Sequence, residues 1–291
     1  MRCTDQQLQL LDFVGENDRL VVDGPAGTGK TLMALESLRR EKESRPDSSV
    51  ALFCFNRLLG QHLTAASASL KIDGKVGRFH KWMQGLVGFN GKTNDSSYWE
   101  EELPKAVADK LLSTEGVLDF LVLDEAQDLL RGRYLDVFDL LLKGGLKEGR
   151  FLFVGDFERQ RIYGEKAELL AKLKNSRNCS YTRCRLDVNC RNSEEISDYV
   201  EKLGRLSPGY SKVLRKDSHM DPSLEFYSCG QDAVDKLEAS IRELKREGFR
   251  DSEIVVLSPV STNSSASILS QRSRWKGVLE NYTTNGNRIR W

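Results

Sequence analysis

The segment GPAGTGKT, from Gly24 to Thr31, constrains the fold of this chain more than any other feature. It satisfies the pattern G-x-x-x-x-G-K-[ST] completely, and it lies between the apolar run LVV (20–22) and the helical stretch KTLMALESLRR. In such a turn, glycines let backbone N–H groups converge on phosphate oxygens, and the helix N-terminus adds positive potential. A chance glycine-rich turn rarely has this strand–turn–helix setting. The segment therefore predicts a phosphate-binding loop.

Four short apolar runs are distributed along the first part of the chain, at 20–22, 50–55, 120–123 and 151–154. Their residues are continuously apolar rather than alternating, which indicates strands that are buried on both faces. Helical patterns separate them, as in parallel sheets covered by helices. We therefore expect an α/β fold with a parallel sheet flanked by helices.

The charge balance and the hydrophobic pattern of the chain limit how it could bind nucleic acid or a membrane. The 291 residues include 44 Lys and Arg against 43 Asp and Glu, so binding to nucleic acid would need a local patch. No apolar run approaches the roughly 20 residues of a membrane span, and the N-terminus lacks a signal-peptide pattern. We expect a cytoplasmic protein with no membrane partner, whose six cysteines are reduced thiols.

A second feature of the sequence, a cluster of acidic residues, indicates what the loop would bind. In LVLDEAQDL (121–129), an apolar run stops at Asp124 and Glu125, and Asp128 follows. Carboxylates this close repel one another unless a cation is near, and a carboxylate after such a strand holds Mg²⁺ in P-loop NTPases. We expect Asp124 and Thr31 to bind Mg²⁺, and Glu125 to orient or deprotonate water. The predicted cofactors are ATP and Mg²⁺, and the predicted reaction is ATP hydrolysis.

The predicted nucleotide-binding residues are those of the loop. Lys30 would reach the β- and γ-phosphates and act in catalysis, while Thr31 would offer its hydroxyl to the cation. The full set consists of Gly24, Pro25, Ala26, Gly27, Thr28, Gly29, Lys30 and Thr31.

Taken with further motifs, DEAQD resembles superfamily 1 helicases of the UvrD/Rep kind. The matching segments follow one another in the family's order over residues 4–196, about two thirds of the chain. Besides the loop and DEAQD, they are TDQQLQLL (4–11), FCFNRLLGQHL (53–63), GRFHKW (77–82), FVGDFERQRIYG (153–164) and LDVNCRNSEEI (186–196). The resemblance implies a RecA-like P-loop NTPase sheet followed by a partial second α/β domain.

On the nucleotide side, the resemblance implies three further residues. Gln7 would read adenine, with Gln6 as the alternative because the adjacent pair leaves the register open. Gln160 would sense the γ-phosphate, although the spacing that precedes it is one residue longer than in the commonest pattern. Arg191 would act as an arginine finger, and Cys190 beside it stands where an aromatic residue is usual.

On the nucleic-acid side, the resemblance implies contacts with a single strand. Asn56 and Arg57 would touch the strand, and Tyr163 could stack on a base. His80 belongs to the next motif, in which Arg78 replaces the usual threonine. The predicted partner is single-stranded nucleic acid, DNA rather than RNA.

The expected domains are a RecA-like ATP-binding domain (1–182), with a small surface insertion at 84–116, and a partial second RecA-like domain (183–291). In the second we expect strands at 224–227 and 253–258 and a helix at 231–247. The family's motifs V and VI are not found. The resemblance therefore implies a truncated protein, natural or experimental, with a protein partner supplying the missing helicase or nuclease functions.

The expected function is the ATP-binding and ATP-hydrolysing core of a UvrD-like DNA helicase, coupling ATP to single-strand binding. The alternative is a nucleotide-gated switch or regulatory subunit without motor activity, which the absent motifs favour. A P-loop kinase is a third interpretation. The neighbours Glu125 and Gln127 of Asp124, and the lack of an arginine-rich lid segment, disfavour it.

Overall fold

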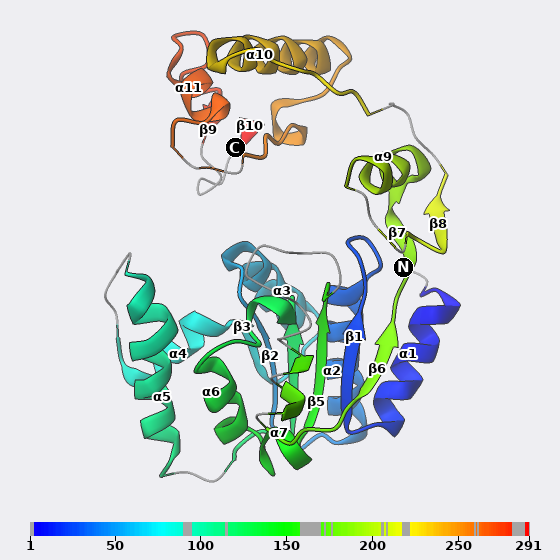
Figure 1. Cartoon of the computed structure of the whole chain (residues 1–291), viewed down its shortest axis with the longest axis vertical. Coiled ribbons are helices and arrows are strands. Elements are labelled where there is room, and N and C mark those ends of the chain that lie inside the picture. Colours follow the sequence, from blue (N-terminus) through cyan, green and yellow to red (C-terminus); the bar gives the residue numbers. More distant parts are fainter. Residues whose placement is uncertain are drawn as a thin grey trace. The chain divides into compact units, whose positions relative to one another are not determined.

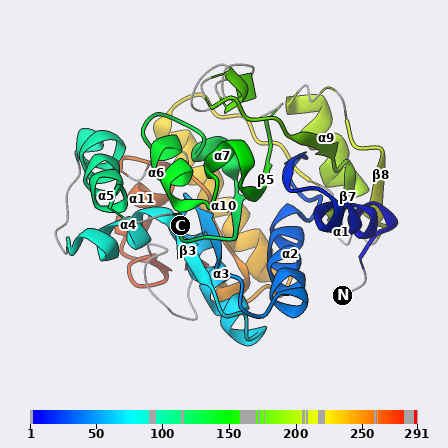
Figure 2. The same cartoon turned by 90° about the horizontal axis from the view of Figure 1, so that it is seen from below.

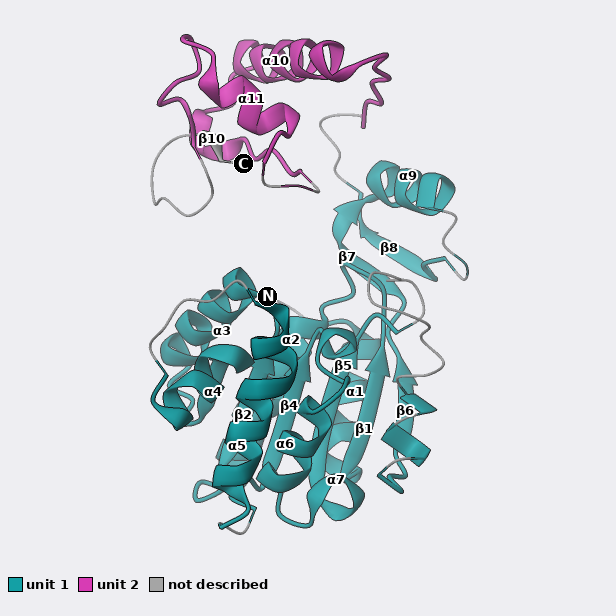
Figure 3. Ribbon diagram, turned by 60° about the vertical axis from the view of Figure 1, so that its left-hand side comes forward, with its two compact units in different colours: residues 1–221 teal, residues 222–291 magenta. Residues whose placement is uncertain are grey.

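The computed structural model describes residues 3–89, 95–113, 116–157, 170–171, 173–175, 177–204, 207, 209–216, 222–258, 260, 262–280 and 289–290. The chain divides into two compact units, residues 1–221 (unit 1) and 222–291 (unit 2), which are coloured separately in Figure 3. Each unit is described by itself.

Unit 1 is built on a six-stranded parallel sheet with the strand order β3-β2-β4-β5-β1-β6 (Figure 1). The strands are β1 (Arg19–Asp23), β2 (Val50–Cys54), β3 (Lys75–Arg78), β4 (Phe120–Asp124), β5 (Arg150–Gly155) and β6 (Thr182–Arg185). Asp23 is in register with Gly155, and Cys54 with Asp124, so the carboxyl ends of four strands lie at one edge. The four predicted strands and the α/β class are confirmed.

Helices cover both faces of this sheet, as Figure 2 shows from below. Successive strand residues alternate between the two layers: Leu121 packs on one face and Val122 on the other. Burial on both faces explains why the strands are continuously apolar. One layer holds α1 (Asp5–Glu16), α2 (Lys30–Ser44) and α3 (Arg57–Ser69); the other holds α4 (Phe79–Val87), α5 (Leu103–Leu111), α6 (Tyr134–Leu141) and α7 (Gly145–Glu148).

Part of the stretch 84–116, which we expected to be a surface insertion, contributes to the core. A π-helical turn (Tyr98–Glu102) leads into α5, whose residues Leu103, Val107 and Leu111 are buried against the layer of α4 and α6. The expectation of a purely superficial segment is therefore wrong for α5. The Gly-, Asn- and Ser-rich residues that suggested it precede this helix, which has its own apolar stripe.

The rest of unit 1 follows β6. Strands β7 (Val188–Ser193) and β8 (Lys212–Arg215) pair in parallel, and α9 (Glu194–Gly204) connects them. Residue 183, where the second domain was expected to begin, lies inside β6, which pairs with β1. The division at 182/183 stays a prediction.

Unit 2 contains α10 (Gly230–Arg246), a 3-10 turn (Asp251–Glu253), α11 (Ser265–Gln271), β9 (Leu279–Glu280) and β10 (Ile289–Arg290). The helix predicted at 231–247 is confirmed as α10. The strands predicted at 224–227 and 253–258 are wrong, since no strand forms at those described residues. Phe226 and Leu257 are 76% and 90% exposed, and pairing at these described residues is limited to a β-bridge at Val255, which is too little for a stable strand.

In the parts of both units that the structure describes, no helix combines the length and the apolar character that crossing a bilayer requires.

Candidate nucleotide and nucleic-acid sites

The turn between β1 and α2 requires glycine at two positions. Gly27 and Gly29 have φ values of +88° and +86°, a left-handed conformation that side chains disfavour. Space is also restricted: a Cβ on Gly27 would lie 2.6 Å from Asn189 Oδ1, and one on Gly29 would lie 2.4 Å from Gln7 Nε2. The loop is thus enclosed by side chains from α1 and β7.

Lys30 is buried and folds back over the loop. Its Nζ donates hydrogen bonds to the carbonyls of Gly24 (2.7 Å) and Pro25 (3.2 Å). The Thr28 hydroxyl donates to the Pro25 carbonyl as well, at 2.9 Å. The ammonium is therefore held at the loop by neutral acceptors, which are weaker partners than phosphate oxygens.

The next three carbonyls of the loop accept hydrogen bonds from distant parts of unit 1. These bonds hold the carbonyls in place and thereby restrain the backbone of the turn. They are Tyr210 Oη to Ala26 O (2.9 Å), Cys190 N to Gly27 O (2.8 Å) and Gln7 Nε2 to Thr28 O (3.0 Å).

Both glutamines proposed to read adenine are engaged within the protein. Gln7 is buried, and its Oε1 accepts a hydrogen bond from Thr4 N, which closes the capping box of α1. Gln6 Nε2 donates to Asp187 Oδ1 at 3.1 Å, and Gln6 Oε1 accepts from Asp187 N at 3.1 Å. The structure shows both side chains supporting the loop or the segment before β7; adenine recognition stays a prediction.

Asp124 ends β4 and is completely buried. Its Oδ1 accepts a hydrogen bond from Glu125 N at 3.0 Å, whereas its Oδ2 has no hydrogen-bond partner among the described residues. Burial raises the pKa of Asp124 to about 6, an effect that the nearby Thr31 hydroxyl and Lys30 oppose. A buried, unsatisfied carboxylate oxygen beside a threonine hydroxyl fits the hard oxygen ligands of Mg²⁺.

Glu125 has a left-handed backbone, with φ +52° and ψ +48°, which is uncommon for a residue with a side chain. Its Oε2 accepts a hydrogen bond of 2.8 Å from Gln127 Nε2. Gln127 Oε1 in turn accepts from Asp156 N at 3.1 Å, just after β5. A Cβ on Gly155 would come within 2.5 Å of Gln127 Oε1, so a side chain there would displace Gln127 from this position. Gln127 connects the ends of two strands, a role that its sequence position alone did not reveal.

Asp23, at the end of β1, holds the start of the segment after β5. Its Oδ1 accepts a hydrogen bond of 2.7 Å from Phe157 N, and its Oδ2 forms an ion pair with Arg183 at 3.3 Å. Gln160 and Tyr163, predicted to sense the γ-phosphate and to stack on a base, lie outside the described residues.

Asn189 shapes the backbone that carries Arg191. It is completely buried; Oδ1 accepts hydrogen bonds from Arg191 N (3.0 Å) and Asn192 N (3.1 Å), and Nδ2 donates to Ser197 Oγ. Arg191 is exposed, two residues from the contact between Asn189 and Gly27. Its role as an arginine finger stays a prediction. Asn189 itself is a positioning residue that the motif contained but that sequence reasoning did not single out.

The predicted strand contacts begin at α3. Asn56 caps this helix, since its Oδ1 accepts from Leu58 N (2.8 Å) and Leu59 N (3.2 Å). Arg57 follows and lines a groove of about 860 Å³ between α3, β3 and α4. Three further cations and an indole line this groove: Lys75, Arg78, Lys81 and Trp82. Of these residues only Arg57 was predicted as a contact; Arg78, Lys81 and Trp82 belong to the segment GRFHKW (77–82), and folding brings them beside Arg57 and Lys75.

His80 is buried, although it was predicted to contact nucleic acid. Its Nε2 is hydrogen-bonded to the Tyr134 hydroxyl at 2.8 Å, and its ring packs edge-on against Phe55 and Trp99. Burial, together with nearby Arg78 and Arg131, lowers the pKa of His80 to about 3. This geometry favours a structural role.

No protein-family model matches the chain, and no curated protein matches it. Among solved structures, it is similar to the Pif1 helicase of Candida albicans (17% identity, TM-score 0.39, covering 64% of this chain and 39% of that one). It is also similar to Bacteroides Pif1 bound to ssDNA (17%, TM-score 0.34, 64% and 42%) and to the Pyrococcus furiosus Hef helicase domain (12%, TM-score 0.39, 84% and 54%). The chain thus spans between 39% and 54% of the length of these structures.

Proposed function

We propose that the chain is the ATP-binding and ATP-hydrolysing core of a UvrD-like superfamily 1 motor that acts on single-stranded nucleic acid. One observation carries the proposal: the unsatisfied Oδ2 of buried Asp124 lies near Lys30 and Thr31 of a complete P-loop. A buried carboxylate oxygen without a hydrogen-bond partner is costly in the interior, and a bound cation would offset that cost.

The loop residues would bind and orient the nucleotide. The Lys30 ammonium would exchange its bonds to the Gly24 and Pro25 carbonyls for stronger bonds to phosphate oxygens. Thr31 and Asp124 would hold Mg²⁺, which when bound neutralises charge on the phosphates. Because the loop carbonyls are already held, little reorganisation would accompany binding.

The residues after β4 would direct the attacking water. The Glu125 carboxylate would accept a hydrogen bond and then the proton of the water, and the Gln127 amide would hold that carboxylate in place. Arg191 would neutralise the charge that develops on the transferred phosphoryl group.

A single strand would be coupled to this site through unit 1. The groove of Arg57, Lys75, Arg78 and Lys81 offers cations for backbone phosphates, and Trp82 offers a surface for stacking. Hydrogen bonds from Tyr210 and Cys190 tie the loop to the β7–β8 segment, so a change at the nucleotide would reach that segment. We propose DNA as the preferred strand, and a protein partner as the source of further helicase or nuclease functions.

The test is Mg²⁺-dependent ATP turnover, with and without single-stranded DNA, for the unmodified chain and Lys30→Ala. Lys42→Ala, the same substitution farther along α2, is the matched control. We expect DNA-stimulated turnover that falls about 100-fold or more in Lys30→Ala and not in the control. Tight ATP binding without turnover would support the nucleotide-gated switch instead. No ATP binding at all would overturn both.

A further inference from the structure

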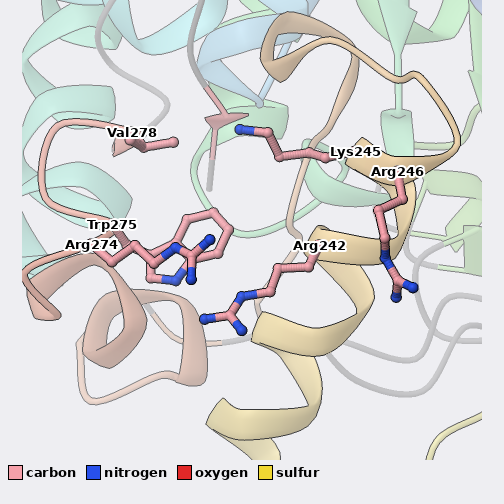
Figure 4. A pocket seen from close by; sticks show the side chains of 6 residues that line it. All are labelled: Arg242, Lys245, Arg246, Arg274, Trp275 and Val278. Atoms are coloured by element: carbon pink, nitrogen blue, oxygen red, sulfur yellow. The ribbon is translucent and has the colours of Figure 1, made fainter.

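Unit 2 contains a pocket of about 330 Å³ between α10 and the turn that follows α11. This volume is in the range of small-ligand sites. The lining residues, drawn in Figure 4, are Arg242, Lys245, Arg246, Arg274, Trp275 and Val278.

Positive charge dominates this pocket. Of its six described lining residues, four are cationic and none is acidic. Arg242, Lys245 and Arg246 share one face of α10 because they lie at helical spacing. Figure 4 shows the Arg242 guanidinium extending toward Trp275 and Arg274, which come from the other wall. Two separate segments of the chain therefore bring cations to one concave surface.

Neighbouring carboxylates balance only part of this charge. Glu238 forms an ion pair with Arg242, but it also pairs with Arg272 at 2.5 Å. Asp251 pairs with Lys245 at 2.8 Å. Among the described residues, these two acids, one of them shared with Arg272, pair with two of the four cations that line the pocket. Like charges around a concave surface raise the local potential, and a bound anion lowers it.

The wall that carries Arg274 is fixed by the core of unit 2. Trp275 is only 4% exposed and packs in the cluster of Val234, Ile241 and Leu269. Its backbone N–H donates to Arg272 O at 2.8 Å, and its backbone carbonyl accepts from Val278 N at 3.0 Å. The Arg274 backbone is therefore preorganised, which reduces the entropy lost when a ligand binds.

We propose that this pocket is a second phosphate-binding site, separate from the P-loop. Its arginines can form bidentate bonds with phosphate oxygens, which single ammonium groups cannot. Phosphate of this kind has two sources: the backbone of a nucleic-acid strand and the polyphosphate of a free nucleotide. The site lies outside every residue assigned to the ATPase; with a strand as the source it rests on the proposed function and adds a contact to it, and with a free polyphosphate it goes beyond that function.

The experiment uses the full chain with Lys30→Ala as background, so that the P-loop contributes less to binding. Arg242→Gln with Arg274→Gln is compared with Lys276→Gln, an exposed cation near the pocket that does not line it. Glu238 keeps Arg272 as a partner when Arg242 is replaced. The probes are a fluorescent oligothymidylate, titrated at several salt concentrations, and inorganic triphosphate, titrated by calorimetry.

If the source is a strand, the slope of log affinity against log salt should fall by about 1.4 in the double variant, since each phosphate contact on a single strand contributes about 0.7. If the source is a free polyphosphate, triphosphate affinity should fall at least about tenfold. The control should change neither. Equal slopes and equal triphosphate affinities in both variants would overturn the site. Should the double variant not fold, Arg274→Gln alone gives the same comparison with half the expected change in slope.

Failure of this proposal is distinguishable from failure of the ATPase. Absent ATP turnover in the unmodified chain would affect only the P-loop assignment, because neither binding measurement depends on hydrolysis.

Discussion

The side-chain amide of Gln127 donates a hydrogen bond of 2.8 Å to Glu125 Oε2. Because Gln127 also accepts from Asp156 N, one buried amide links the ends of β4 and β5. Glu125 has an unfavourable backbone conformation, which the surrounding structure must hold in place, and the Gln127 amide holds its carboxylate. The orientation of the proposed base therefore depends on Gln127.

Replacing Gln127 should impair turnover more than nucleotide binding. Gln127→Leu keeps a similar volume but removes both hydrogen bonds, so Glu125 would lose its orientation and Asp156 N its partner. We expect kcat to fall about tenfold or more, with ATP affinity within about threefold of the original. Steady-state kinetics and fluorescent-nucleotide titration measure the two. Gln9→Leu, at an exposed position of α1, is the control; an unchanged kcat in Gln127→Leu would contradict the assigned role.

Tyr210 should support nucleotide affinity from a distance. Its hydroxyl donates to Ala26 O across 184 residues of sequence. Tyr210→Phe removes this bond, and a hydrogen bond of about 1 kcal/mol corresponds to roughly fivefold weaker ATP binding. Equilibrium nucleotide titration provides the measurement. Tyr199→Phe, an exposed tyrosine of α9, should bind ATP as the original does; equal affinities in all three proteins would contradict the link.

The groove beside α3 should contribute to strand binding through its charge. Arg57→Gln with Lys81→Gln should lower the salt slope of oligothymidylate affinity by about 1.4, because two phosphate contacts are lost. ATP affinity should stay the same. Fluorescence anisotropy at several salt concentrations gives the slope. The matched control changes two exposed lysines outside the groove, Lys147→Gln with Lys174→Gln, and a similar loss there would indicate nonspecific charge instead.

His80 should make unit 1 sensitive to acid. Its pKa, about 3 in the folded protein against 6.5 ordinarily, means that the unfolded chain binds the proton first. The contribution of neutral His80 to the free energy of unfolding is therefore fully present above pH 6.5. It is lost as the pH falls from 6.5 towards 3, and the loss is roughly 2–3 kcal/mol at pH 4.5.

Urea unfolding at pH 7 and pH 4.5 tests this contribution. His80→Gln should lose less stability between the two pH values than the unmodified chain, because the residue that must remain neutral is absent. His62→Gln, which changes an exposed histidine of α3, should lose as much as the unmodified chain. An equal loss in both variants would contradict the role of His80.

The central sheet could be predicted because its strands are apolar on both faces. Strands β1, β2, β4 and β5 matched their runs, whereas β3 and β6 were missed. These two are the edge strands, with the polar sequences KVGR and TRCR, and an edge needs fewer apolar residues. The opposite error occurred in unit 2, where the described residues of the apolar runs at 224–227 and 253–258 form no strand, apart from a single β-bridge at Val255.

The residues of the candidate site also divide into those that a local sequence pattern identifies and those that only folding brings together. Lys30, Thr31 and Asp124 belong to local patterns, so sequence could assign them roles. The contacts of Tyr210 and Asn189 with the loop join residues more than 160 positions apart, and no local pattern encodes them. Burial of His80 likewise depends on Tyr134 from another helix, not on its own motif.

The enclosure of the loop has an evolutionary consequence. A side chain at position 27 or 29 would collide with Asn189 or Gln7 even if the backbone could accept it. A relative with a residue other than glycine at either position would need a smaller neighbour at position 189 or 7. Positions 27 and 189, and positions 29 and 7, should therefore covary among homologous sequences.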